Sequence, residues 1–199
     1  ARRQRQMCIR DRYHPHFLFN ALNTVYFQID ESNKAPRRTL EMISELLRYQ
    51  LYGGNQKVSI LQEIDYLKTY IALRKLRMSE RLRLRVEFPP ELNELNIYPL
   101  LFLPLVENAF KYVGGDYQLD IIMKWENNRI SLFIRNSIPE LSAEDEALRK
   151  SVDKRQRKGI GLVNLRRRLS LLYPNKHRLE TRKEETEFVA ELMIEIEDI

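Results

Sequence analysis

The feature that most constrains this chain is a change in hydrophobic periodicity near residue 80. Before it, apolar residues recur at intervals of three and four, which is the spacing of one face of an α-helix. After it, apolar and charged residues alternate, as at Leu82, Leu84 and Val86, which is typical of a strand with one buried face. The sequence therefore predicts an α+β fold, with a helical front followed by a body of strands and helices.

Three amphipathic helices are predicted before that change. The first carries Leu18, Leu22, Val25 and Ile29 on one face. The second lies between a break at residues 33–36 and the Gly53-Gly54-Asn55 sequence. The third opens with a capping box, Ser59 and Gln62, and is expected to run to about residue 79. Because the chain offers these apolar faces no obvious partner, the pattern favours a bundle completed by dimerisation.

The body contains a predicted helix, a hairpin, a long polar loop, a second helix and two further strands. Their expected ranges are 98–113 for the helix, 119–134 for the hairpin with Asn127-Asn128 at its turn, 138–158 for the loop, 159–173 for the second helix, and 178–182 and 187–195 for the strands. A loop of that length inside a compact domain is usually functional or disordered.

The net charge of +6 is concentrated at the N-terminus. Five arginines and one aspartate fall within residues 1–12, so the basic charge argues only weakly for nucleic-acid binding by the body. The sequence Met7-Cys8-Ile9-Arg10-Asp11-Arg12 resembles a translated sequencing adapter, and we interpret residues 1–12 as an artefact of sequencing or cloning. Cys8 is the one cysteine, so an internal disulfide is excluded.

Two groups of residues in the body have the chemistry of a phosphate site. Glu107, Asn108 and Lys111 are close enough on a predicted helix to share one side. A carboxylate and an amide oxygen suit Mg²⁺, and a lysine can face phosphate. Gly159 and Gly161 begin the next helix, where small residues and the helix N-terminus favour close approach of an anion. Each signal is weak alone, and their order and combination strengthen them.

In the front, His14 and His16 flank Pro15 at the start of a predicted helix. A metal site needs more ligands than this segment offers, and a structural role in the core remains open for either histidine. A neutral imidazole is also a competent nucleophile toward a γ-phosphoryl group.

Three segments resemble motifs of the LytS/YehU-type sensor histidine kinases. His-Pro-His-Phe-Leu-Phe-Asn at residues 14–20 is similar to their phosphoacceptor motif. Residues 104–111 resemble the N box of their ATP site, and residues 159–169 resemble their glycine box with the helix that follows. The similarity covers about residue 13 to the C-terminus.

The resemblance implies a domain plan and a phosphoacceptor. Residues 13–80 would form a helical dimerisation and phosphotransfer region, and residues 81–199 a Bergerat-type (GHKL) ATP-binding α/β sandwich with a mixed, mostly antiparallel sheet. By motif position, His16 is the residue that becomes phosphorylated. The family has asparagine where this chain has His14, which is therefore a substitution more readily than a second acceptor.

The resemblance also implies an ATP and Mg²⁺ site. Asn108 would hold Mg²⁺ with the assistance of Glu107, and Lys111 would meet phosphate. Gly159, Gly161 and Leu162 would belong to the ATP lid and its hinge. Asn136 stands where the family has the aspartate that reads adenine, and no glycine follows it, so adenine recognition departs from the usual pattern.

The implied function is that of a two-component sensor kinase. It would phosphorylate itself on His16 and pass the group to an aspartate of a response regulator, often of the LytTR type, without binding nucleic acid directly. The chain would be the cytoplasmic portion of a homodimeric protein, anchored in the bacterial inner (plasma) membrane by a sensor region outside this sequence. Two alternatives stay open: a degenerate transmitter that docks a regulator or acts as a phosphatase without autokinase activity, and another enzyme of the same ATP fold.

Overall fold

The computed structural model describes residues 15–52, 56–90, 92, 95–140 and 160–196. The predicted artefact at 1–12, His14, most of the predicted polar loop and Gly159 lie outside the described residues. The helices are α2 (Pro15–Gln28), α3 (Lys34–Tyr52), α4 (Ile60–Lys75), α5 (Leu103–Tyr112) and α7 (Ile160–Leu172), and the strands are β1 (Val58–Ser59), β2 (Arg83–Glu87), β3 (Asn96–Ile97), β4 (Gln118–Glu126), β5 (Arg129–Ser137), β6 (His177–Lys183) and β7 (Glu187–Glu195).

The centre of the molecule is a five-stranded sheet with the strand order β2-β4-β5-β7-β6. Strands β2 and β4 pair in parallel, and the other neighbours pair antiparallel. Strands β1 and β3 form a separate two-stranded ladder. The predicted α+β class and the mixed, mostly antiparallel sheet are therefore confirmed.

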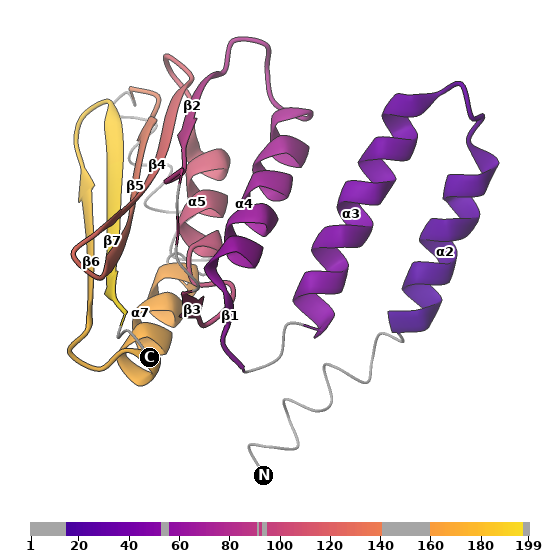
Figure 1. Cartoon of the computed structure of the whole chain (residues 1–199). Coiled ribbons are helices and arrows are strands. Elements are labelled where there is room, and N and C mark those ends of the chain that lie inside the picture. Colours follow the sequence, from indigo (N-terminus) through magenta and orange to yellow (C-terminus); the bar gives the residue numbers. More distant parts are fainter. Residues whose placement is uncertain (1–14, 53–55, 91, 93–94, 141–159, 197–199) are drawn as a thin grey trace.

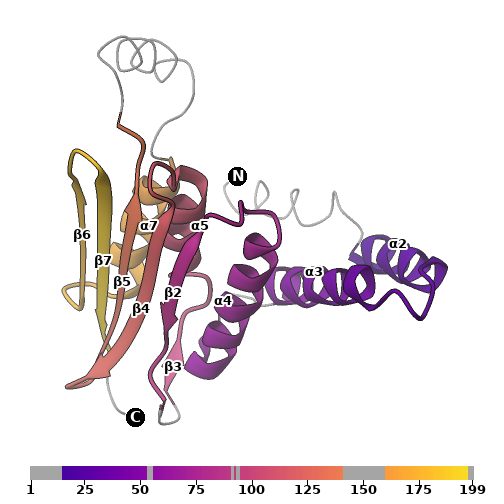
Figure 2. The same ribbon diagram turned by 90° about the horizontal axis from the view of Figure 1, so that it is seen from above.

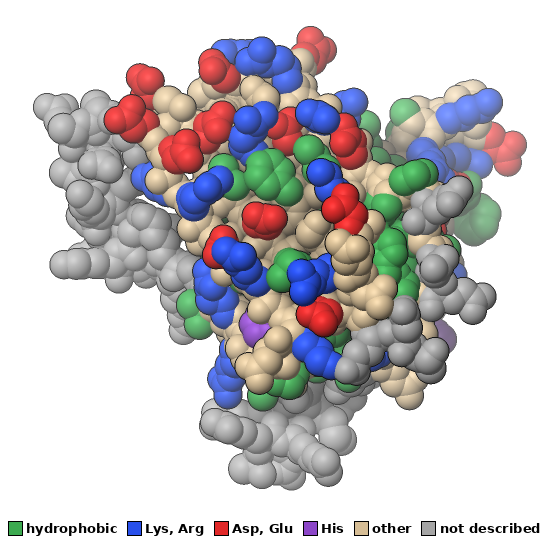
Figure 3. All heavy atoms as spheres, turned by 60° about the vertical axis from the view of Figure 1, so that its left-hand side comes forward, with side chains coloured by type: hydrophobic (Ala, Val, Ile, Leu, Met, Phe, Trp, Pro, Cys, Tyr) green, Lys and Arg blue, Asp and Glu red, His purple; other side chains and the backbone are tan. Residues whose placement is uncertain are grey.

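Helices α5 and α7 cover one face of the sheet, and α4 lies alongside α5 as a further layer (Figures 1 and 2). The opposite face has acidic and basic side chains mixed with small apolar patches (Figure 3). Ion pairs such as Arg135–Asp120, at 2.6 Å, cross neighbouring strands on that face. Figures 1 and 2 thus place every described helix on one side of the sheet.

The hairpin of β4 and β5 follows directly from its sequence. Leu119, Ile121 and Met123 occupy every second position of β4, and all three are buried against the helices. Asn127 and Asn128 have φ values of 51° and 59°, the left-handed conformation that a two-residue turn between twisted strands requires. The predicted hairpin and its turn are confirmed.

Helix α4 belongs to the core of the body. Its capping box at Ser59 and Gln62 is present as predicted, and the helix ends at Lys75, a turn earlier than expected. Ile64 and Leu67 are buried in the same apolar cluster as the strands. The domain boundary near residue 80 stays a prediction, but this packing favours a division between α3 and α4.

Helix α5 corrects one prediction. A helix over 98–113 was expected from the apolar run, whereas the helix begins at Leu103. Leu100 has a left-handed φ of 61°, which a right-handed α-helix cannot include, so the helix can begin only after Leu100. Pro104 consequently lies in the first turn, where the missing N–H of proline costs no hydrogen bond.

Helices α2 and α3 form a hairpin that projects from the body (Figures 1 and 2). The connection lies at residues 29–33, where Arg37 donates to the Ile29 carbonyl, so the break is earlier than the predicted 33–36. Helix α2 has no buried residue, whereas α3 buries Met42 and Leu46. The hairpin therefore meets the body through α3, which packs along α4.

Candidate functional site

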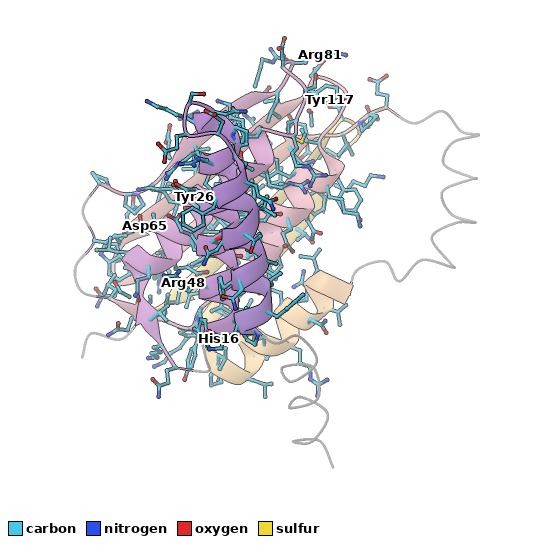
Figure 4. All side chains as sticks on the ribbon, turned by 90° about the vertical axis from the view of Figure 1, so that its right-hand side faces the viewer. His16, Tyr26, Arg48, Asp65, Arg81 and Tyr117 are labelled. Carbon is cyan, nitrogen blue, oxygen red and sulfur yellow. The ribbon has the colours of Figure 1, made fainter. Side chains whose placement is uncertain are left out.

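His16 lies in the first turn of α2 and is exposed, on the hairpin and not on the body (Figure 4). Pro15 before it occupies the first helical position, which suits its fixed φ and missing donor. One turn later, Phe19 stacks on Tyr52 of α3 with ring centroids 6.3 Å apart, and the Arg48 guanidinium lies 5.8 Å from the Phe19 ring. These contacts hold the start of α2 against α3 and leave the His16 imidazole accessible to solvent.

Helix α5 presents Asn108 and Lys111 as predicted. Asn108 is partly buried and Lys111 is exposed, with its Nζ 5.1 Å from the centre of the Tyr112 ring. They are three positions apart on the helix and therefore lie on the same side.

Glu107 points to a different side of α5. Its electrostatic neighbours Tyr66, Tyr70 and Arg74 are all on α4, and consecutive residues are about 100° apart around a helix. Desolvation raises the pKa of Glu107, and the Arg74 guanidinium opposes that rise. The expectation that Glu107 and Asn108 share one side is therefore only partly met.

Asn136 lies near the end of β5 with 1% of its surface exposed. Its Nδ2 donates to the Ser137 carbonyl at 3.3 Å, whereas its Oδ1 is buried and has no hydrogen-bond partner among the described residues. A buried acceptor without a donor is costly unless a donor arrives from elsewhere. Asn136 is thus the described amide side chain most in need of a ligand.

The turn between α5 and β4 is hydrogen-bonded to the end of β5. The Ser137 hydroxyl donates to the Gly114 carbonyl at 2.6 Å, and the Gly114 amide donates to the Ser137 carbonyl at 3.0 Å. A Cβ on Gly114 would lie 2.8 Å from Pro139, and Gly115 has a φ of +60°. The two glycines permit the close approach that brings the helix of Asn108 and the strand of Asn136 to one place.

Helix α7 completes this side of the body. Leu162 is partly buried against the main core, and Gly161 is exposed with nothing within 4 Å of where its Cβ would be. No contact requires glycine at that position, so Gly161 leaves open space at the helix start. The structure thus gathers Asn108, Asn136 and Leu162 onto neighbouring elements, with His16 on the separate hairpin.

Sequence reasoning missed the polar residues where the hairpin, α4 and α7 meet. These are Tyr49, Glu63, Tyr66, Arg74 and Arg168. The four-residue spacing of Tyr66, Tyr70 and Arg74 is a signal that could have placed three polar-tipped side chains on one face of α4.

Residues 5–82, which include the exposed His16, match the family model described as histidine kinase. This part of the chain is therefore similar to the histidine kinase family. The chain is also similar to the sensor protein kinase HptS of Staphylococcus aureus strain USA300, with 28% identity over 176 residues. That alignment covers 86% of this chain and 34% of HptS, so the chain spans about a third of the length of this curated relative. The chain is therefore a distant homologue of HptS.

Solved structures of histidine kinases resemble this chain at low sequence identity. The histidine kinase AdeS of Acinetobacter baumannii is 13% identical with a TM-score of 0.46, over 93% of this chain and 96% of that one. Full-length ShkA, solved in complex with AMPPNP, is 14% identical with a TM-score of 0.48, over 92% of this chain and 44% of that one.

Two features are absent from the described residues. Among them, no helix has the length and apolar character needed to cross a bilayer. The same residues contain no group of three or more His, Cys, Asp or Glu side chains arranged to hold a metal ion.

Proposed function

We propose that this chain is the transmitter part of a two-component sensor kinase, which uses Mg-ATP to phosphorylate His16. The observation that carries the proposal is that the segment matching the histidine kinase family contains His16 at the exposed start of α2. Exposure matters because the acceptor imidazole must reach a nucleotide bound on another element.

The transfer needs little covalent help from the protein. An unprotonated imidazole nitrogen of His16 attacks the γ-phosphorus of ATP, the bond from that phosphorus to the bridging β–γ oxygen breaks, and ADP leaves. The resulting phosphohistidine donates the group to an aspartate carboxylate of a response regulator. Catalysis in phosphoryl transfer comes mainly from positioning and from stabilising charge.

The side chain of Asn136 offers adenine a hydrogen-bond acceptor. The buried Oδ1 of Asn136 lacks a donor among the described residues, and an exocyclic amino group of adenine is a donor of the right kind. The family's aspartate supplies a charged acceptor in that place, so an asparagine would accept the same hydrogen bond with less strength.

The phosphate end of the nucleotide would lie between α5 and α7. Asn108 would ligate Mg²⁺ through its amide oxygen, and Lys111 would face phosphate. By the same resemblance, Gly159 and Gly161 would offer backbone N–H groups to phosphate. When bound, Mg²⁺ neutralises the charge that develops on the phosphate oxygens.

The partners follow from the same proposal. The exposed apolar residues of α2, Phe17 and Phe27, would be covered by a second copy to form a homodimer. The acceptor of the phosphoryl group would be a response regulator, of the LytTR type by resemblance. A sensor region outside this sequence would anchor the protein in the bacterial plasma membrane.

The proposal is tested by label transfer from γ-labelled Mg-ATP to the purified chain. We expect a label that is lost in acid and retained in alkali. It should be absent from His16→Gln and Asn108→Ala, and present in His14→Gln, which is a matched control two residues away.

Calorimetric binding of Mg-ATP separates the alternatives. Binding without label by a dimeric wild-type chain would favour a degenerate or phosphatase-type transmitter. A label that survives in His16→Gln and is lost from His14→Gln would overturn the choice of acceptor.

A further inference from the structure

The contact between the α2–α3 hairpin and the body centres on one buried carboxylate. Glu63 on α4 has 0% of its surface exposed. Its Oε2 accepts a hydrogen bond from the Tyr49 hydroxyl of α3 at 2.6 Å and another from the Leu100 amide, just before α5, at 3.0 Å. One oxygen atom therefore joins the hairpin, α4 and the entrance to α5.

Helix α7 takes part in the same arrangement. The positive charge of Arg168 interacts favourably with Glu63, and its Nη1 donates to the Leu100 carbonyl at 3.5 Å. Leu100 is held at a φ of 61°, which is uncommon for a leucine and persists only where surrounding contacts fix it.

Packing alone does not account for a carboxylate at this position. Burial raises the pKa of Glu63, while the Tyr49 hydroxyl and the Leu100 amide oppose the rise. The second oxygen, Oε1, is buried without a hydrogen-bond partner among the described residues. An apolar residue of similar volume would fill the space without the cost of removing a carboxylate from water.

A small apolar cluster next to Glu63 also holds the hairpin to the body, but it does not fix the orientation of the hairpin. Leu46 of α3, Tyr66 of α4 and Leu103 of α5 form a small cluster of their own beside the main core. Burial of apolar area is non-directional, whereas a hydrogen bond weakens steeply as its geometry departs from linear. The hydrogen bonds to Glu63 can therefore fix an orientation that the apolar cluster cannot.

We propose that Glu63 is a positioning residue that fixes the angle between the phosphoacceptor hairpin and the body. The catalytic consequence rests on the proposed function. His16 lies on the hairpin, whereas the nucleotide would lie on α5, β5 and α7. A change in the angle between hairpin and body would therefore move the attacking nitrogen of His16 relative to the γ-phosphorus.

The test compares two Tyr→Phe substitutions on the hairpin of the full chain. Tyr49→Phe removes the hydroxyl that reaches Glu63. Tyr26→Phe removes a hydroxyl that donates to Glu41 at 3.1 Å within the hairpin itself, and serves as the matched control. Both variants keep the ring and its packing, so folding is expected to survive in each.

Three quantities are measured: the rate of labelling, the Kd for Mg-ATP and amide hydrogen exchange. Tyr49→Phe should lower the rate of labelling at saturating Mg-ATP about ten-fold, because small misplacements of reacting groups are costly. It should leave the Kd for Mg-ATP unchanged. Amide hydrogen exchange over residues 46–52 should become faster in Tyr49→Phe, and exchange in β4 and β5 should not change. Tyr26→Phe should match the wild type in all three respects.

Glu63→Gln provides the second variant, since it keeps the shape of the side chain and removes the charge. It should reproduce the hydrogen-exchange change of Tyr49→Phe. The positioning role is overturned if Tyr49→Phe and Tyr26→Phe behave alike, or if Tyr49→Phe weakens Mg-ATP binding as much as it slows labelling. A wild-type chain that takes no label would refute the proposed kinase, while hydrogen exchange would still decide the role of Glu63.

Discussion

The α2–α3 hairpin and the body contain the same kinds of apolar side chain but use them differently. Phe17 and Phe27 on α2 are 76% and 79% exposed, whereas Phe102 and Phe110 at α5 are 0% and 3% exposed. The body thus completes its own core, while the hairpin leaves its apolar side chains available to a partner. In the proposed homodimer, stability and assembly would therefore reside in separate parts of the chain.

The largest expected effect comes from a cavity in the body. Phe102→Ala removes a fully buried ring and should lower the free energy of unfolding by about 3–5 kcal/mol. Denaturant unfolding followed by the fluorescence of Trp125 would measure it. Phe27→Ala is the matched change on the hairpin and should leave the unfolding of the body within about 0.5 kcal/mol of wild type. Equal losses of unfolding free energy in Phe102→Ala and Phe27→Ala would show that the hairpin and the body do not differ in this way.

The second effect concerns association of two copies. Phe27→Ala should raise the dimer Kd about 10–100-fold, because burying a phenylalanine contributes about 1.5–3 kcal/mol. Sedimentation over a range of concentrations would measure the change. Phe102→Ala, at concentrations where it is folded, should dimerise like the wild type. A dimer indifferent to Phe27 would show that another surface is used.

The third effect tests whether nucleotide binding belongs to the body alone. Asn136→Ala deletes the unpartnered acceptor and should weaken Mg-ATP binding about ten-fold by calorimetry, which corresponds to one hydrogen bond to a neutral group. Asn96→Ala alters an exposed asparagine on β3 and should bind like the wild type. Unaltered affinity in Asn136→Ala would mean that this oxygen does not read the base.

The smallest effects come from two glycines of the body with opposite expected signs. Gly115→Ala forces a side chain onto a φ of +60° and should destabilise the fold by about 1 kcal/mol. Gly161→Ala lies in α7 with nothing within 4 Å of the new Cβ, and should stabilise by about 0.5–1 kcal/mol. Thermal unfolding of both variants would check the signs. Destabilisation by Gly161→Ala would reveal a contact made by residues outside the described ranges.

The secondary structure followed closely from periodicity, and the exceptions have physical causes. The segment before α5 is apolar because Leu101 and Phe102 are fully buried, not because it is helical, and an apolar run cannot distinguish the two. The apolar stripe of α4 showed that one face is buried but not which surface covers it. Its packing into the body therefore could not be predicted from its own sequence.

The candidate site likewise contains residues that could be predicted from the sequence and residues that could not. His16, Asn108 and Asn136 could be proposed because each lies in a short contiguous motif. The arrangement around Glu63 could not, because Tyr49, Leu100 and Arg168 are far apart in sequence and come together around Glu63 only in the folded chain.

The docking of α3 has a consequence for the order in which the protein is made. The apolar cluster that receives α3 includes Leu103, which is synthesised about fifty residues after α3 ends at Tyr52. At a translation rate of about 5–20 residues per second, the hairpin waits several seconds for that surface to exist. During that interval Phe17 and Phe27 have no body to compete for them. In the proposed homodimer, two copies would therefore be able to associate through their hairpins before either body has folded.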